Sequence, residues 1–126
     1  MAKILVVDDE PNNRYLLEVI LKVFQEKGVG ILYAVDGKEG LELILREKPD
    51  LVFLDIMLPE MDGYEVCSRT KKTHGLTQVY IVLLTARSRD SIHQKAADAG
   101  ADMTIYKPFK VLTIVDTVQK VLGIKA

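Results

Sequence analysis

The sequence alternates short apolar runs with longer amphipathic stretches from one end to the other. The apolar runs are nearly continuous in Val, Ile and Leu, which is typical of parallel strands that are buried on both faces. A fifth run is weaker than the other four but has the same character. The pattern therefore predicts five strands, at residues 4–7, 31–35, 51–54, 79–84 and 103–106.

The stretches between these runs predict five helices. Two are expected over residues 63–73 and 88–98, the second with Ser88 as its N-cap and Gly100 after its end. The other three carry apolar residues at helical spacing. These residues are Leu16, Leu17, Ile20, Leu21 and Phe24 in the first helix, Leu41, Ile44 and Leu45 in the second, and Val111, Ile114, Val115, Val118, Val121 and Leu122 in the last.

Strands that alternate with helices predict an α/β fold with right-handed crossovers and helices on both faces of a parallel sheet. For five strands we expect a doubly wound sheet in the order 2-1-3-4-5. The connections change direction between the first and third strands. A ligand crevice is therefore expected at the carboxyl ends of these two strands.

Composition narrows the class of protein. The chain has 126 residues, 48% of them hydrophobic, and fits one domain spanning residues 1–126. Its formal charge of −1 argues against binding nucleic acid or a membrane surface through bulk positive charge. No run approaches the roughly 20 apolar residues of a membrane helix. A single cysteine, Cys67, fits a reducing compartment, so a cytoplasmic location is expected, and His74 and His93 are expected to be isolated surface residues.

Carboxylates follow the two strands that flank the predicted crevice. Asp8, Asp9 and Glu10 come directly after the first strand, and Asp55 comes directly after the third. Clustered carboxylates are costly away from water unless a cation holds them, and oxygen ligands of this kind suit Mg²⁺. The sequence therefore predicts a magnesium site at this edge of the sheet.

The fourth and fifth strands add two further groups to the same edge. Thr85 follows the fourth strand, and Lys107 follows the fifth. Each of these residues alone would be explained as a helix cap, a turn residue or a surface lysine. Together with the acids they favour a carboxylate that accepts a phosphoryl group while a cation, an ammonium and a hydroxyl bind its oxygens.

At these residues the sequence resembles the receiver domain of two-component response regulators, over essentially its whole length. The motifs that carry the resemblance are Val6-Val7-Asp8-Asp9-Glu10, the segment Asp55-Ile56-Met57-Leu58-Pro59-Glu60-Met61-Asp62-Gly63, Leu84-Thr85-Ala86 and Lys107-Pro108-Phe109. Supporting motifs are Ala34-Val35-Asp36-Gly37 and Ala99-Gly100-Ala101-Asp102. The resemblance implies the flavodoxin-like receiver fold.

The resemblance also implies a phosphoacceptor and a metal site. Asp55 would accept the phosphoryl group of a phosphohistidine on a histidine kinase or phosphotransfer protein. Asp8, Asp9, Asp55 and the backbone carbonyl of Met57 would hold Mg²⁺. The protein would then act as a signalling switch and not as an enzyme with turnover on a separate substrate.

The remaining implied features concern the switch itself. Lys107 would pair with a phosphate oxygen, Thr85 would move toward another, and the Lys107-Pro108 peptide bond would be cis. The signal would leave through a protein partner bound to the fourth helix, fifth strand and fifth helix, without direct contact to nucleic acid or membrane.

Three positions are expected to tune the switch. The family usually has Tyr or Phe three residues before the lysine, where this chain has Thr104, and Tyr106 lies nearest. Because side chains alternate along a strand, residues 104 and 106 share a face. Either Tyr106 serves that face or the aromatic step is absent, and we expect a switch that is not centred on a buried ring.

Met57 and Arg87 flank the path of the attacking water and are expected to set the phosphoryl lifetime.

Several alternatives remain open or lack their motif. The chain can be a receiver fragment of a longer regulator or of a hybrid kinase. A phosphohydrolase of the haloacid dehalogenase type needs a second acid two residues after the nucleophile, where this chain has Met57. A nucleotide or flavin module needs a Gly- or hydroxyl-rich loop after the first strand, which here reads Asp8-Asp9-Glu10-Pro11. A receiver fold without the chemistry would lack some of the pocket residues, and all are present.

Overall fold

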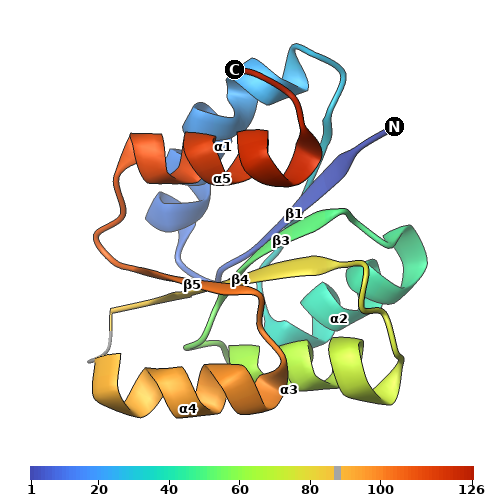
Figure 1. Cartoon of the computed structure of the whole chain (residues 1–126), viewed down its shortest axis with the longest axis vertical. Coiled ribbons are helices and arrows are strands. Elements are labelled where there is room, and N and C mark those ends of the chain that lie inside the picture. The colour runs from blue at the N-terminus through green and yellow to red at the C-terminus, as the bar shows by residue number, and fades with distance from the viewer. Residues whose placement is uncertain (87–88) are drawn as a thin grey trace.

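A computed structural model of the protein describes residues 1–86 and 89–126 (Figure 1). Strands and helices alternate along these residues, as the apolar pattern predicts. The strands are β1 (Lys3–Val7), β2 (Gly30–Ala34), β3 (Leu51–Asp55), β4 (Tyr80–Thr85) and β5 (Met103–Tyr106). The helices are α1 (Pro11–Gln25), α2 (Gly37–Glu47), α3 (Gly63–Ser68), the π-helical turn η1 (Arg69–Thr73), α4 (Arg89–Ala99) and α5 (Val111–Leu122).

The five strands form one parallel sheet in the order β2-β1-β3-β4-β5, which confirms the predicted topology. The direction of the connections changes between β1 and β3. In the register of these two strands Val7 lies opposite Leu54. Asp8 and Asp55, the next residue of each strand, therefore emerge side by side at the carboxyl edge of the sheet.

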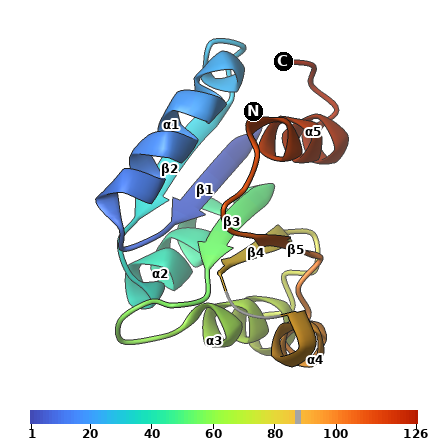
Figure 2. The same cartoon turned by 90° about the vertical axis from the view of Figure 1, so that its left-hand side faces the viewer.

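Helices cover both faces of the sheet (Figures 1 and 2). Helices α1 and α5 pack on one face, where Leu17, Phe24 and Ile114 are fully buried. Helices α2, α3 and α4 pack on the other, with Ile44 and Val66 in that core. The described helices all lack the length and apolar character of a membrane-spanning segment.

The start of α2 explains why β2 ends earlier than predicted. The expected strand includes Val35, but β2 ends at Ala34. The Asp36 Oδ1 atom accepts a hydrogen bond from the Glu39 N–H at 2.7 Å, and the Val35 N–H donates to Glu39 Oε1 at 2.9 Å. The bond to Glu39 occupies the Val35 N–H, which could otherwise continue the strand. Val35 is consequently exposed and belongs to the helix entry.

The third predicted helix, residues 63–73, is not a single α-helix. It winds as an α-helix to Ser68 and continues as a π-helical turn, in which the His74 N–H donates to the Arg69 carbonyl at 2.9 Å. The buried Thr70 hydroxyl donates to the Val66 carbonyl at 2.8 Å. A β-branched residue that bonds back to the preceding turn disturbs regular α-helical winding. Periodicity alone gives no sign of this change.

One member of the predicted apolar stripe of α1 does not join the core. Leu17, Leu21 and Phe24 are fully buried, whereas Leu16 is 43% exposed. Tyr15 and Val19 on the same helix are also exposed. Helix α1 therefore carries an apolar surface as well as an apolar core face. Ser88, the predicted cap of α4, lies outside the described residues.

Candidate functional site

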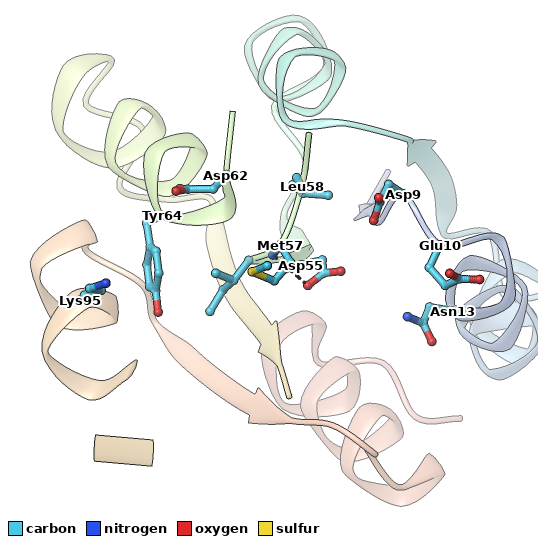
Figure 3. Close-up of a pocket in the computed structure, with 10 residues that line it drawn as sticks. Asp9, Glu10, Asn13, Asp55, Met57, Leu58, Asp62, Tyr64 and Lys95 are labelled. Carbon is cyan, nitrogen blue, oxygen red and sulfur yellow. Dashed lines mark hydrogen bonds between the residues drawn. The ribbon is translucent and has the colours of Figure 1, made fainter. Parts of the chain in front are cut away.

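A cleft of about 730 Å³ opens at the carboxyl edge of β1 and β3 (Figure 3). Asp9, Glu10 and Asn13 lie on one side of it, Tyr64 and Lys95 on the other, and Asp55 lies between them. These residues come from the β1–α1 segment, the end of β3, and helices α3 and α4. The cleft forms where the sequence predicts a ligand crevice.

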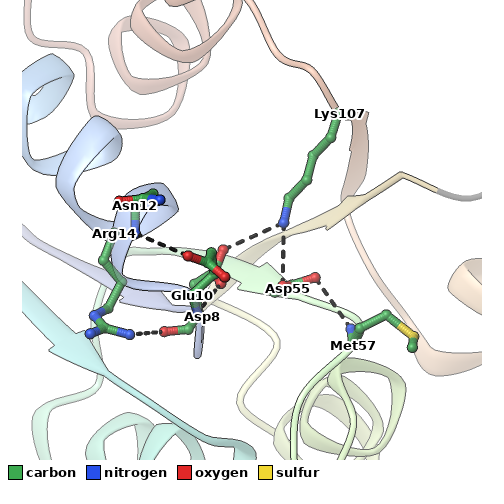
Figure 4. Close-up of polar contacts among 7 residues, drawn as sticks. All are labelled: Asp8, Glu10, Asn12, Arg14, Asp55, Met57 and Lys107. Carbon is green, nitrogen blue, oxygen red and sulfur yellow. Dashed lines mark hydrogen bonds and ion pairs between the residues drawn. The ribbon is translucent and has the colours of Figure 1, made fainter.

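Asp8 is fully buried and its backbone and side chain are both held (Figure 4). Its N–H donates to the Ala34 carbonyl of β2 at 3.1 Å. Its carbonyl accepts from Arg14 Nη1 at 2.7 Å, and its Oδ1 atom accepts from the Glu10 N–H at 2.9 Å. These bonds fix the direction of the carboxylate toward Asp55 and Lys107.

Asp55 is the last residue of β3 and is 6% exposed. Its Oδ1 atom accepts a hydrogen bond from the Met57 N–H at 3.2 Å. Burial raises the pKa of Asp55 above its ordinary value, and the neighbouring Asp8 carboxylate raises it further, against the opposing charge of Lys107. The ionised carboxylate is thus held in surroundings that favour a proton or a bound cation.

Lys107 reaches this pair of carboxylates from the end of β5 (Figure 4). Its Nζ atom lies 3.3 Å from Asp55 Oδ2 and 3.5 Å from Asp8 Oδ2. Its backbone N–H donates to the Thr85 carbonyl at 2.7 Å, which ties β5 to the end of β4. The Lys107-Pro108 bond is cis, as the resemblance implies.

Asp8, Asp9 and Asp55 together offer a set of ligands for a hard cation. Each has a carboxylate oxygen within 4.8 Å of the others, and Asp9 is exposed at the opening of the cleft. Among the described residues, Lys107 forms ion pairs with Asp8 and Asp55, so the three carboxylates exceed the one ammonium that pairs with them. All-oxygen ligands with access to water are the ligands that Mg²⁺ prefers. The residues therefore fit the ion.

The loop from Ile56 to Asp62 lies beside Asp55 because Gly63 allows it to fold tightly. The Gly63 N–H donates to the Ile56 carbonyl at 2.9 Å. A Cβ atom at Gly63 would lie 2.8 Å from Ile56 Cα and would overlap the Asp55 carbonyl oxygen. Only glycine permits this approach. The loop in turn brings the backbone of Met57 next to the Asp55 carboxylate.

The remaining predicted residues lie around this centre. Thr85 ends β4, is 1% exposed, and follows Leu84, which pairs with Asp55 in the sheet register. The Met57 side chain is 58% exposed, so the loop presents a thioether and not a second acid beside Asp55. Tyr106 pairs with Thr85 in the register and packs, half-buried, against the core beneath α3 and α4. Arg87 lies outside the described residues.

Several residues at this site were not among the predicted site residues, and Asp62 is one of them. Asn13 and Arg14 lie in the first turn of α1, and their position just after the acidic segment is a signal that could have indicated them. Tyr64 and Lys95 meet across α3 and α4, with the Lys95 Nζ atom 5.9 Å from the centre of the Tyr64 ring. No local pattern connects two residues that far apart in the chain.

Cys67 and the two histidines do not line the cleft, and the histidines are surface residues as predicted. Cys67 is buried, its Sγ lies 3.4 Å from the Ala99 carbonyl, and burial raises its pKa to about 12. A thiol in this state is a poor nucleophile. His74 and His93 are exposed, and neither lines the cleft.

Comparison with known proteins identifies the same family as the sequence motifs. Residues 4–119 match the family described as the response regulator receiver domain. The chain is 35% identical over 124 residues to the sporulation initiation phosphotransferase F of Bacillus subtilis, covering 98% of this chain and 96% of that protein. It is 40% identical over 120 residues to a probable transcriptional regulator, ycf27, of Porphyridium aerugineum, covering 95% of this chain but 48% of the relative. The chain thus spans about half the length of several curated relatives.

A solved structure shares the whole fold. The receiver domain of a sensor histidine kinase from Pseudomonas aeruginosa, solved with a magnesium ion coordinated in its active site cleft, superposes with a TM-score of 0.84. It is 26% identical and covers 98% of each chain. The strand order, the acidic cleft and the family match agree, and the protein belongs to the response regulator receiver domains of two-component signal transduction.

Proposed function

We propose that the protein accepts a phosphoryl group on Asp55 from a phosphohistidine of a histidine kinase or phosphotransfer protein, in a reaction that depends on Mg²⁺. The single observation that carries the proposal is the buried Asp55 carboxylate, which lies beside Asp8 and shares the ammonium of Lys107. A carboxylate in such surroundings gains from any partner that spreads or neutralises its charge.

The Asp55 side chain supplies the nucleophile. One carboxylate oxygen attacks phosphorus, the bond between phosphorus and the imidazole nitrogen breaks, and the imidazole leaves with the bonding electron pair and takes up a proton. The Met57 N–H, 3.2 Å from Oδ1, holds the carboxylate in place during the attack. Lys107 lies against the other oxygen, Oδ2, and would follow the charge onto the phosphoryl oxygens.

Asp8, Asp9 and Asp55 would hold Mg²⁺ together with the backbone carbonyl of Met57. The ion would supply positive charge that offsets both the carboxylates and the phosphoryl oxygens. The three carboxylates already lie within reach of one cation. The Glu10 N–H would hold the Asp8 carboxylate in position, and Arg14 would hold the Asp8 backbone carbonyl.

Thr85 and Lys107 would carry the change toward the partner surface. Lys107 is tied through its backbone to the Thr85 carbonyl, so a shift of either residue moves the ends of β4 and β5 together. A groove of about 320 Å³ follows the outer edge of β5 and includes Tyr106 and Lys110. We infer that a downstream protein binds the α4-β5-α5 face and that its affinity changes with phosphorylation, by a typical coupling of about 1–3 kcal/mol.

The phosphodonor would approach over α1. An apolar recess of about 310 Å³ adjoins the cleft and is lined by Leu16, Pro108 and Phe109, while Asn13 borders both. Tyr15 and Val19 extend this apolar surface along α1. A helix of the donor that packed there would bring its phosphohistidine to the opening of the cleft. This surface is continuous with the site that the donor must reach.

This activity is that of a switch, and we do not propose turnover on a separate substrate. A phosphohydrolase of the haloacid dehalogenase type would have an acid at the position of Met57. The cytoplasmic location stays a prediction. So does action as a stand-alone receiver, with a longer regulator as the alternative.

The proposal is tested by intact mass measurement after incubation with Mg²⁺ and phosphoramidate, a small donor with a phosphorus–nitrogen bond. The parent should gain the mass of one phosphoryl group, and chelation of Mg²⁺ should prevent the gain. Asp55→Asn should gain none, while Asp62→Asn, which changes another acid of the same cleft, should gain as much as the parent. A parent that stays unmodified would overturn the proposed function.

The partner surface is tested separately. Amide signals of α4, β5 and α5 are compared with and without beryllofluoride, which mimics the phosphoryl group. We expect shifts across these elements without inward movement of the Tyr106 ring. A ring that swings inward would show that Tyr106 replaces the aromatic residue missing at Thr104.

A further inference from the structure

Gly37, the first residue of α2, is in contact with a backbone segment from another part of the chain. It is buried, and a Cβ atom built on it would lie 2.7 Å from the Met61 carbonyl carbon and 2.9 Å from Met61 Cβ, and would overlap the Met61 carbonyl oxygen. Two of these three atoms belong to the backbone. Real Cβ atoms do not approach other atoms this closely, so any side chain at this position requires one of the two segments to move.

Met61 belongs to the loop that carries Met57 beside Asp55. Figure 2 shows this loop passing from the end of β3 beside α2 to the start of α3. The loop is folded on itself, with the Leu58 N–H donating to the Ile56 carbonyl at 3.1 Å and the Met61 N–H to the Pro59 carbonyl at 2.8 Å. Glu60 has a positive φ of 68°. A displacement of Met61 would therefore be passed along the loop toward Met57.

Helix α2 is the more firmly held of the two segments. Its first turn is fixed by the side-chain cap of Asp36 and the bond from the Val35 N–H to Glu39, and Leu41 and Ile44 anchor it in the core. Most of the loop side chains, by contrast, reach solvent, and Met57 is 58% exposed. A clash at Gly37 would accordingly be relieved by movement of the loop and not of the helix.

We propose that Gly37 is a positioning residue for the phosphoacceptor site. Its missing side chain lets the loop rest on the first turn of α2, and this contact keeps the Met57 N–H at 3.2 Å from Asp55 Oδ1. The position of the loop against Gly37 follows from these contacts alone. The effect of that position on phosphorylation rests on the proposed function. The contact between Gly37 and Met61 thereby links helix α2 to the phosphoacceptor site.

The test compares Gly37→Ala with Gly30→Ala. Both add one methyl group in place of a glycine hydrogen, but a Cβ at Gly30 would meet only ordinary contacts, 3.6 Å and more away, at the far end of β2. The first readout is the set of backbone amide signals. Gly37→Ala should shift the signals of Met57 and Met61, and Gly30→Ala should leave both in place. Unshifted Met57 and Met61 signals in folded Gly37→Ala would overturn the proposal.

The second readout is kinetic. Gly37→Ala should lower the rate of phosphorylation by phosphoramidate about tenfold, since small displacements of reacting groups cost this much or more. It should also raise the Mg²⁺ concentration needed for half the maximal rate, which a loss of stability in a still folded protein would not change. If the amide signals shift but the phosphorylation rate and its Mg²⁺ dependence equal those of the parent, the contact exists but does not position the site. If even the parent is not phosphorylated, the proposed function fails while the amide readout still decides the position of the loop against Gly37.

A second variant covers the case in which Gly37→Ala does not fold. Asp36→Ala removes the side-chain cap of α2 without adding atoms, which weakens the start of the helix. It should loosen the first turn and speed amide hydrogen exchange at Met61. Parental exchange at Met61 in Asp36→Ala would show that the loop does not depend on α2.

Discussion

The carboxylate of Asp55 is held where its charge is unfavourable. Burial and the neighbouring Asp8 raise its pKa, and Lys107 offsets only part of that effect. A carboxyl whose pKa is higher in the folded protein than in the unfolded chain adds stability below its unfolded pKa and loses that contribution as the pH rises through the folded value. At neutral pH, without Mg²⁺, the ionised Asp55 therefore destabilises the fold.

Replacing Asp55 with Asn should raise the melting temperature at pH 7 in Mg²⁺-free buffer. The expected rise is roughly 3–6 °C for each kcal/mol of relieved repulsion. The difference should disappear below pH 3.8, the ordinary pKa of the group, where the parent side chain is also neutral. Calorimetry at several pH values measures both effects.

The control for this prediction is Asp116→Asn, which neutralises an exposed acid on α5. It should change the melting temperature little. Mg²⁺ should stabilise the parent more than Asp55→Asn, because the variant offers one carboxylate fewer. A lower melting temperature for Asp55→Asn at pH 7 would mean that the charge of Asp55 stabilises the fold.

Replacing Lys107 with Met should have the opposite effect on stability. The ammonium lies between Asp8 and Asp55 with its side chain 18% exposed, and its removal leaves the two acids facing each other. We expect the free energy of unfolding to fall by about 1–3 kcal/mol, less than for a fully buried pair. Urea denaturation of this variant and of Lys110→Met, an exposed lysine at the start of α5, gives the comparison. Equal stability of the two variants would contradict the shared ion pair.

At the residue scale, the sequence predicted the centre of the site but not its supports. Asp8, Asp55, Thr85 and Lys107 follow four parallel strands, whose carboxyl ends meet at one edge whatever the details of the loops. The contact between Gly37 and Met61 depends on the path of a loop in three dimensions. Strand and helix patterns carry no information about such a path.

At the scale of elements, α1 has one apolar face in the core and other apolar side chains at the surface, where we propose that the donor binds. Leu17 and Phe24 pack into the core, whereas Leu16 is 43% exposed at the recess beside the cleft. A helical stripe read from sequence includes all three, since periodicity does not distinguish a core contact from a surface meant for a partner. The same limit applies to α3, where the pattern continued through the π-helical turn after Ser68.

Replacing Leu16 with Glu should slow phosphorylation by a protein donor but not by a small-molecule donor. Transfer from a phosphorylated histidine phosphotransfer domain should slow about tenfold or more, as expected when a central apolar contact is lost. Phosphorylation by phosphoramidate should stay at the parental rate, because a small donor needs no surface on α1. Rates from both donors are measured on the same protein preparation.

The control for Leu16→Glu is His74→Glu, which adds an acid at an exposed turn outside the cleft. It should leave both rates unchanged. Equal slowing with both donors in Leu16→Glu would mean that the substitution damages the site itself. Parental transfer from the protein donor would remove α1 from the docking surface.

For the whole molecule, the formal charge of −1 hides an uneven distribution. Asp8, Asp9, Glu10 and Asp55 gather at one edge of the sheet, where the topology changes direction between β1 and β3. The strand order was predictable because the apolar runs are buried on both faces and alternate with helices. That order alone places the acids together, which is why the fold and the site could be predicted jointly.

The most direct test of the central claim is to identify the phosphorylated residue. The protein is phosphorylated in the presence of Mg²⁺ and treated with borohydride, which reduces an aspartyl phosphate to homoserine, and the peptides are then sequenced by mass spectrometry. Homoserine should appear at position 55 and depend on both Mg²⁺ and the donor. Homoserine at Asp8 or Asp9 with none at Asp55, or a phosphoryl group recovered on His74 or His93, would contradict the account.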